Sequence, residues 1–335
     1  MRIRNTLLAL ALGASTLAMA GTALAADKVK VVASFSILGD MVREIGGEHV
    51  ELTTLVGPDG DAHVYEPTPS DARAVGAAQL LVVNGLQFEG WLPRLVETAE
   101  FKGTEVVATA GIAPIPFGAE EHEDHAAGEA EHKHEAGEAG HEDHAHAAAG
   151  GDHAGHDHGS NDPHAWQDLS NGLVYAENIV KGLSAVDPEN AADYRAKGDA
   201  FIAEIKAMDA EVKAELRTVP EAQRKVVTSH DAFGYFARAY KIDFLAPEGV
   251  STDAEASASD VAKIIDQIRH EGIAAIFVEN VSDPRLIERI STETDAKIGG
   301  TLYSDALSGP DGAAPTYLKM FQNNIEQIIK ALKTS

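Results

Sequence analysis

The segment VKVVASFSILGDMVREIGG (residues 29–47) decides the fold class, because in it a strand is followed directly by a helix. Residues 29–35 form a short apolar run rich in β-branched side chains, which is typical of a buried strand. The apolar residues that follow recur at a helical period: Leu38, Met41, Val42 and Ile45. Two glycines, Gly46 and Gly47, then end the predicted helix.

The same alternation repeats along the rest of the chain. Further strands are predicted at residues 50–56, 80–83, 105–108, 225–228, 244–246, 274–278 and 298–302. Helices are predicted at residues 71–78 with Ser70 as N-cap, 91–99, 232–240, from Ser257 or Ser259 to Arg269, 284–294 and 316–332. Strands that alternate with helices imply parallel sheets, so the predicted fold class is α/β.

A long helix is predicted to join two lobes. Residues 188–217 carry one apolar face without a Gly-rich hinge, and about thirty helical residues span roughly 45 Å. We therefore expect an N-terminal α/β lobe at 26–187, this rigid linking helix, and a C-terminal α/β lobe at 218–335. A stiff helix between the lobes would limit their relative motion.

The N-terminus has the pattern of a secretory signal peptide. A basic start (MRIR) precedes an apolar stretch at residues 7–20 and the small-x-small site Ala23-Leu24-Ala25, which predicts a signal peptide at 1–25. The apolar stretch is short for a membrane anchor. We expect the mature chain, about 310 residues, in the periplasm. Because the sequence has no cysteine, a cysteine-linked lipid is excluded, and any metal must be bound by histidine and carboxylate.

Residues 119–160 form a run of His, Glu, Asp, Ala and Gly with almost no large apolar side chain, so we expect a disordered loop. Its ten histidines are candidate auxiliary metal ligands: His122, His125, His132, His134, His141, His144, His146, His153, His156 and His158. The alternatives are an acidic solvated linker or an affinity tag. Histidines interleaved with acidic residues in mid-chain argue against a tag. The sequence thus predicts a flexible arm that gathers metal with modest affinity.

The chain is strongly acidic, with a formal net charge of −26. The 119–160 run carries twelve acidic residues and one lysine, and it supplies −11 of this charge. An acidic surface argues against nucleic acid and anionic membranes as partners, and it attracts cations. Solubility alone would also explain much of the acidity.

Four residues are candidate ligands of a built metal site: His63, His164, His230 and Asp305. Each lies in a predicted loop beside turn residues, and in open α/β sheets ligands bind beyond the carboxyl ends of the strands. Two lie in each half, so a site between the lobes could collect all four. Three imidazoles and one carboxylate suit zinc, and the carboxylate also admits manganese. A lone loop histidine is usually structural or exposed, as we expect for His49 and His270, and spacing alone does not set the other three apart.

A family resemblance does set them apart. The segments GDAHVYEPTPSD (60–71), DPHAW (162–166), SHDAFGYF (229–236) and YSD (303–305) resemble, in order, the ligand motifs of the zinc- and manganese-binding periplasmic proteins that feed ABC transporters. The resemblance implies two α/β lobes on a rigid helix, with metal bound between them by His63, His164, His230 and Asp305. It also implies limited motion on binding, delivery to a membrane permease driven by an ATPase, and no enzymatic activity. We expect a monomer.

The resemblance favours Zn2+, with Mn2+ or broad specificity as the alternative. His230 is similar to the zinc members, whereas manganese members more often carry glutamate there, and a His-rich loop is a feature of zinc members. Two departures point the other way: this chain lacks the disulfide of many zinc members, and Asp305 is a ligand type shared with manganese members.

Two other functions remain as alternatives. A zinc hydrolase would use Glu66 or Asp231 as general base, but the sequence has no His-Glu-x-x-His helix and no Gly-x-Ser-x-Gly elbow. Four protein ligands would also leave little room for an activated water. A metal buffer or adhesin would act without a transporter, although the missing lipid anchor disfavours a surface adhesin.

Overall fold

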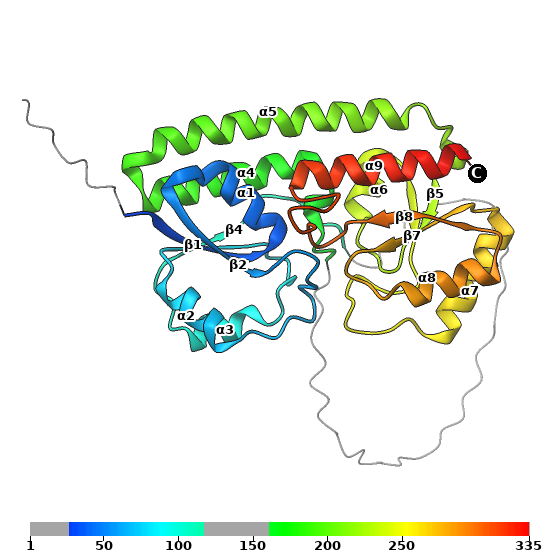
Figure 1. The fold of residues 1–335 in the computed structure, drawn as a ribbon, viewed down its shortest axis with the longest axis horizontal. Coiled ribbons are helices and arrows are strands. Elements are labelled where there is room, and N and C mark those ends of the chain that lie inside the picture. The colour runs from blue at the N-terminus through cyan, green and yellow to red at the C-terminus, as the bar shows by residue number, and fades with distance from the viewer. Residues whose placement is uncertain (1–26, 117–160, 335) are drawn as a thin grey trace, which may run out of the picture.

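The computed structural model describes residues 27–116 and 161–334, which form two α/β lobes side by side (Figure 1). Each lobe is built on a four-stranded parallel sheet, with strand order β2-β1-β3-β4 in the first and β6-β5-β7-β8 in the second. The predicted α/β class with two lobes is confirmed. The predicted signal peptide and His-rich loop lie outside the described residues.

The first sheet contains β1 (Val29–Phe35), β2 (Val50–Val56), β3 (Leu80–Val83) and β4 (Thr104–Val107). Its helices are α1 (Ser36–Gly46), α2 (Pro69–Ala77), α3 (Leu92–Thr98) and α4 (Leu169–Val186). The two central strands are almost wholly buried, because helices cover both faces of the sheet. This burial explains why β1 and β3 read as continuous apolar runs rather than as alternating ones.

The second sheet contains β5 (Lys225–Val227), β6 (Asp243–Leu245), β7 (Ala275–Glu279) and β8 (Lys297–Leu302). Its helices are α6 (Gly234–Tyr240), α7 (Ala258–Glu271), α8 (Pro284–Glu293) and α9 (Tyr317–Thr334). Of the two serines predicted to begin α7, Ser257 is the N-cap, and its hydroxyl accepts a hydrogen bond from the Asp260 backbone N–H.

The prediction of Ser70 as the N-cap of the second helix was wrong. The helix begins two residues earlier, with Thr68 as N-cap and Pro69 in the first turn. The Asp71 carboxylate accepts a hydrogen bond from the Thr68 backbone N–H at 2.6 Å, which satisfies a donor that the helix leaves free. Proline at the first helical position needs no such partner, so the start at Thr68 is the more stable one.

The long linking helix is confirmed as α5 (Ala191–Leu216), which follows a short 3-10 turn at Pro188–Asn190. It runs along both lobes and packs against α4, α1 and α9 (Figure 1). Helix α4 was not predicted. It packs along α5 and against η2 (Ala165–Gln167), the turn that leads out of the site described below.

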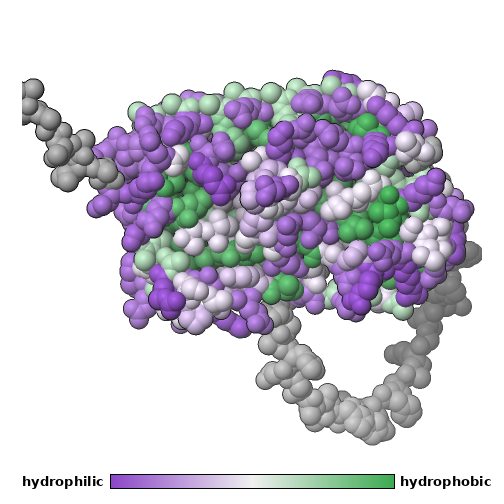
Figure 2. Space-filling view, viewed as in Figure 1, coloured by the Kyte–Doolittle hydropathy of each residue, from purple (hydrophilic) through white to green (hydrophobic). Residues whose placement is uncertain are grey.

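One hydrophobic core extends through both lobes. It includes Phe35 and Trp166 on the N-terminal side together with Phe236 and Phe321 on the C-terminal side. The lobes are therefore held together by shared packing as well as by α5. The face in Figure 2 is mostly hydrophilic, with smaller hydrophobic areas between polar ones. Among the described residues, no helix has both the length and the apolar character to cross a membrane.

Candidate metal centre

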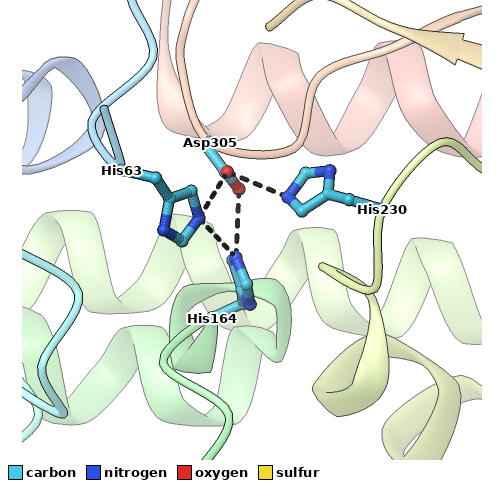
Figure 3. A group of neighbouring side chains, drawn as sticks. All are labelled: His63, His164, His230 and Asp305. Carbon is cyan, nitrogen blue, oxygen red and sulfur yellow. Dashed lines mark hydrogen bonds and ion pairs between the residues drawn. The ribbon is translucent and has the colours of Figure 1, made fainter. Parts of the chain in front are cut away.

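The structure brings the four predicted ligands together between the lobes (Figure 3). One potential ligand atom from each of His63, His164, His230 and Asp305 lies within 4.8 Å of all the others. His63 follows β2, His230 follows β5 and Asp305 follows β8, so three of them lie beyond the carboxyl ends of parallel strands. His164 instead immediately precedes η2.

The Asp305 carboxylate lies at the centre of the cluster. Its Oδ2 is 3.2 Å from Nε2 of His63 and 3.1 Å from Nε2 of His230. Its Oδ1 is 3.5 Å from Nε2 of His164, and the Nε2 atoms of His63 and His164 are 3.3 Å apart. All three imidazoles therefore present the same ring nitrogen to one point.

The cluster is almost completely shielded from water. The side chains of His164, His230 and Asp305 have no exposed surface, and that of His63 is 5% exposed. Charges in such a site interact strongly, because little solvent screens them. Only His63 reaches toward the surface, and the next residue, Val64, is exposed.

Asp162 orients His164. Its Oδ1 accepts a hydrogen bond from the His164 backbone N–H at 2.9 Å and lies 2.8 Å from Nδ1 of the same ring. A carboxylate can only accept, so we assign the ring proton to Nδ1. Once the ring has lost its second proton, the lone pair of Nε2 faces the centre of the cluster, which is the arrangement that a ligating histidine needs.

Glu279, the last residue of β7, supports His230 from the side opposite the cluster. Its Oε1 accepts hydrogen bonds from the backbone N–H groups of Ser229 and His230, at 2.8 and 2.9 Å. Its Oε2 lies 2.8 Å from Nδ1 of His230. This one carboxylate therefore holds the backbone turn by hydrogen bonds and faces the ring as an ion-pair partner, since neither Oε2 nor Nδ1 makes a hydrogen bond within the described residues.

The sequence reasoning did not assign either supporting carboxylate. Asp162 stands two residues before its histidine in the motif DPHAW (162–166), and an aspartate at this spacing commonly bonds to the backbone two residues on. Glu279 is a charged residue at the end of an apolar strand, and a charge in that position indicates a buried partner. The general-base candidates lie elsewhere: Glu66 is exposed, and Asp231 is partly buried but outside the cluster.

The charges of the cluster shift its pKa values in opposite directions. Burial alone would raise the pKa of Asp305, but the neighbouring His230 and His164 outweigh it and hold that pKa well below its usual range. Burial would lower the pKa of His164, yet the charge of Asp305 and the contact with Asp162 raise it to about 9. In His230, Glu279 and Asp305 likewise overcome burial and raise the pKa well above the ordinary value. For His63 burial prevails, and the pKa falls.

Two aromatic side chains of the N-terminal lobe pack against the cluster, and one of them also donates a hydrogen bond next to Asp305. Phe88 packs edge-on against His63 with ring centroids 4.8 Å apart, and Trp166 packs against His164 at 5.2 Å. The indole N–H of Trp166 donates to the Ser304 carbonyl at 2.8 Å, directly before Asp305. The first lobe thus helps to place a candidate ligand of the second.

The donor set fits a divalent transition metal. Three imidazole nitrogens and one carboxylate form a four-coordinate set, and each group is held by the protein rather than by solvent. The Oδ1 atom of Asp305 is buried and has no hydrogen-bond partner among residues 27–116 and 161–334. A buried carboxylate oxygen without a donor is costly, and a bound cation would remove that cost.

Comparison with known proteins identifies the family. The family described as "ZnuA: Zinc-uptake complex component A periplasmic" matches residues 31–331. The chain belongs to this family. Its members are periplasmic solute-binding proteins of ABC transporters, which bind metal ions and act with a membrane permease, and they are not enzymes. The zinc hydrolase alternative is therefore wrong.

Relatives resemble the chain over nearly its whole length. The iron-binding protein YfeA of Yersinia pestis is 32% identical over 305 residues, covering 91% of this chain and 86% of the relative. The manganese-binding lipoprotein MntA of Halalkalibacterium halodurans is 29% identical over 313 residues, covering 93% of this chain and 91% of the relative. These names differ in the metal.

Solved structures share the fold. The manganese-bound periplasmic metal-binding protein from Candidatus Liberibacter asiaticus matches with a TM-score of 0.73 and 29% identity, covering 91% of this chain and all of that one. The periplasmic zinc-binding protein TroA from Treponema pallidum matches with a TM-score of 0.76 and 26% identity, covering 91% and 99%. The family is thus established as metal-binding, while its members are named for different ions.

Proposed function

We propose that this protein captures Zn2+ between its lobes, with His63, His164, His230 and Asp305 as ligands, and delivers the ion to the permease of an ABC importer. The observation that carries the proposal is the convergence of three imidazole Nε2 atoms on one buried carboxylate. Nitrogen-rich four-coordinate sites suit zinc, which has no competing geometric preference.

Manganese, or a broad range of metals that includes iron, is the alternative cargo. It is favoured by the relatives named for manganese and iron. It is also compatible with Asp305, because carboxylate oxygen suits manganese. Against it stand three nitrogen donors to one carboxylate, whereas manganese prefers sites rich in oxygen. Selectivity must therefore be measured directly.

We further propose that the His-rich segment 119–160 gathers metal for this site. Its sequence supports a weak, multi-site chelator. The residues on either side of it lie next to each other, because Pro116 and Asn161 form an antiparallel bridge and the Asp162 backbone N–H donates to the Ile115 carbonyl at 2.8 Å. The nearest described residues before and after the segment therefore lie beside Asp162, which stands two residues before the candidate ligand His164.

The remaining features of the proposal come from the sequence. We infer a signal peptide at residues 1–25, a periplasmic mature chain that acts as a monomer, and lobes at 26–187 and 218–335 joined through 188–217. The opposite possibility, a buffer that needs no transporter, would place most of the function in the 119–160 segment rather than in the four-residue cluster.

Calorimetric titration of the metal-free mature protein tests the proposal. Zn2+, Mn2+ and Fe2+ are titrated separately into the intact chain and into a variant in which residues 119–160 are replaced by a short Gly-Ser link. The adjacent positions of Pro116 and Asn161 make this deletion compatible with the fold. His63→Ala in the deletion variant serves as the site control.

One tight zinc site that survives the deletion and is lost in His63→Ala, with weaker sites lost on deletion, supports the proposal. Manganese or iron bound as tightly as zinc would change the cargo but not the site. No tight site in the deletion variant would refute the four-residue site and leave the segment as the functional part.

A further inference from the structure

The turn that precedes His63 is bonded to the opposite lobe at three points. The Asp59 backbone N–H donates to the Leu307 carbonyl at 2.8 Å, and the Asn280 side chain donates to the Asp59 carboxylate at 3.1 Å. The Thr252 hydroxyl donates to Oδ2 of Asp61 at 2.5 Å. A short turn of the first lobe is therefore held by three separate segments of the second.

Asp61 differs from the other two contacts, because it also bonds to a ligand residue. Its second oxygen, Oδ1, accepts a hydrogen bond from the His63 backbone N–H at 2.9 Å. One carboxylate thus connects the backbone of His63 with Thr252 across the boundary between the lobes. The short distance to Thr252 is that of a charge-assisted hydrogen bond, the stronger class of such bonds.

Thr252 lies in the segment 246–257, between β6 and α7, and this segment also holds the His230 turn. The Glu248 backbone N–H donates to the Ser229 carbonyl at 3.2 Å, and the Asp231 backbone N–H donates to the Gly249 carbonyl at 3.0 Å. The residues on both sides of His230 are therefore bonded to the segment that carries Thr252.

We propose that Asp61 and Thr252 are positioning residues that form a latch over the metal site, and that opening of this pair sets the rate at which the ion is released. The inference rests on the proposed function, because it takes His63 and His230 to be ligands. The latch joins the ligand-bearing turns of both lobes. While it is closed, His63 cannot move outward without pulling the 246–257 segment with it.

The direction of release follows from the exposure of the ligands. His63 is the only ligand of the four with any exposed side-chain surface, and Val64 beside it is 49% exposed. The other three side chains are enclosed by both lobes. The shortest movement that uncovers the ion is therefore an outward shift of the His63 turn, and the Asp61–Thr252 bond opposes that movement.

The test is the rate of zinc release in the mature protein, followed by stopped flow after mixing with excess EDTA at two EDTA concentrations. Thr252→Val removes the hydroxyl but keeps the shape of the side chain. Thr252→Ser restores a donor to Asp61. Thr98→Val makes the same chemical change at the end of α3, where the hydroxyl bonds only to its own helix among the described contacts.

We expect Thr252→Val to release zinc about tenfold faster, a factor that corresponds to about 1.4 kcal/mol, near the lower limit for a hydrogen bond to a charged group. The association rate should change by less than about twofold, because the free turn can still close on an ion. Thr252→Ser and Thr98→Val should release zinc at the wild-type rate.

Equal release rates in wild type and Thr252→Val would overturn the latch, as would a Thr252→Ser variant that releases zinc as fast as Thr252→Val. Thermal unfolding of the metal-free variants shows whether a faster rate reflects lost stability, which would also count against the latch. Failure of the proposed function is a separate result, because the wild-type protein would then bind no zinc tightly in the equilibrium titration.

Discussion

The substitution Glu279→Gln tests whether the supporting carboxylate matters for metal binding. The glutamine oxygen can still accept the backbone N–H groups of Ser229 and His230, because that role belongs to Oε1 alone. The new amide nitrogen then faces Nδ1 of His230, and two N–H donors cannot point at each other. The ring must give up that contact, or lose its Nδ1 proton and keep the one on Nε2, the atom that faces the ion.

The expected loss of zinc affinity follows from the interaction that each outcome removes. Loss of a contact with a charged acceptor costs about 1.5–3 kcal/mol, which is roughly a ten- to hundredfold weaker Kd. A ring whose only proton is on Nε2 gives a similar loss, because metal binding must then return that proton to Nδ1, where the glutamine N–H opposes it. Residues that orient metal-ligating histidines typically show effects of this size, about 10–100-fold, when they are replaced.

The assay is competition between the protein and a chelator of known zinc affinity, at fixed pH and salt. Glu89→Gln is the matched control. Glu89 is a buried glutamate of the first lobe that accepts hydrogen bonds from the Ser34 hydroxyl and the Asn84 backbone N–H, and burial raises its pKa. It contacts none of the four candidate ligands through a described bond. We expect Glu89→Gln to change the Kd by less than about twofold.

Wild-type affinity in Glu279→Gln would refute this reasoning, provided that circular dichroism shows the variant to be folded. A weakened Kd in both variants would also refute it, because the effect would then come from loss of a buried carboxylate in general rather than from the orientation of His230.

Two further predictions concern protons. Burial raises the pKa of Asp40, in α1, from 3.8 to about 6, although its carboxylate accepts the Tyr317 backbone N–H at the start of α9. The unfolded chain thus loses this proton near pH 4 and the folded chain near pH 6, so stability from this group is full below pH 4 and is lost as the pH rises through that window. The free energy of unfolding of metal-free Asp40→Asn, measured in urea, should therefore rise relative to that of wild type by up to about 3 kcal/mol between pH 4 and 7. A difference between the two proteins that does not change with pH would contradict this. Zinc should also release protons at pH 7.5, because the Asp305 and Asp162 charges overcome burial and raise the pKa of His164 to about 9. The binding enthalpy should then vary with the ionisation enthalpy of the buffer, and a constant value would show that the histidine is neutral before binding.

The sequence predicted most strands and helices because their periodicity is local. Helix α4 escaped prediction because tertiary contacts decide it. Gly172 and Gly182 lower its helix propensity, yet a side chain at either position would collide with a neighbour, Tyr317 or Val106. The glycines are present to permit close packing, and a pattern read along one segment does not show the partner that requires them.

The four candidate ligands were predicted from ordered motifs, since a histidine in a loop carries no spatial information by itself. The residues that support these candidate ligands cannot be predicted from such motifs. Glu279 is 49 residues from the backbone N–H of His230, and Thr252 is 191 residues from Asp61. Such pairs are brought together by the sheet order and by packing between the lobes, so only the folded structure shows them.

The arrangement of the lobes limits how an ion can enter and leave. Helix α5 packs against both lobes, and one hydrophobic core runs through them. A wide hinge opening would therefore expose apolar surface, at a free-energy cost of about 25 cal/mol for each Å2. Moving the His63 turn alone breaks a few hydrogen bonds and uncovers little of that core, chiefly Ala62 beside His63. Opening at this turn is therefore the less costly route. We therefore expect a docking permease to act on this turn, because displacing it would remove the candidate ligand His63 and leave the other three in place.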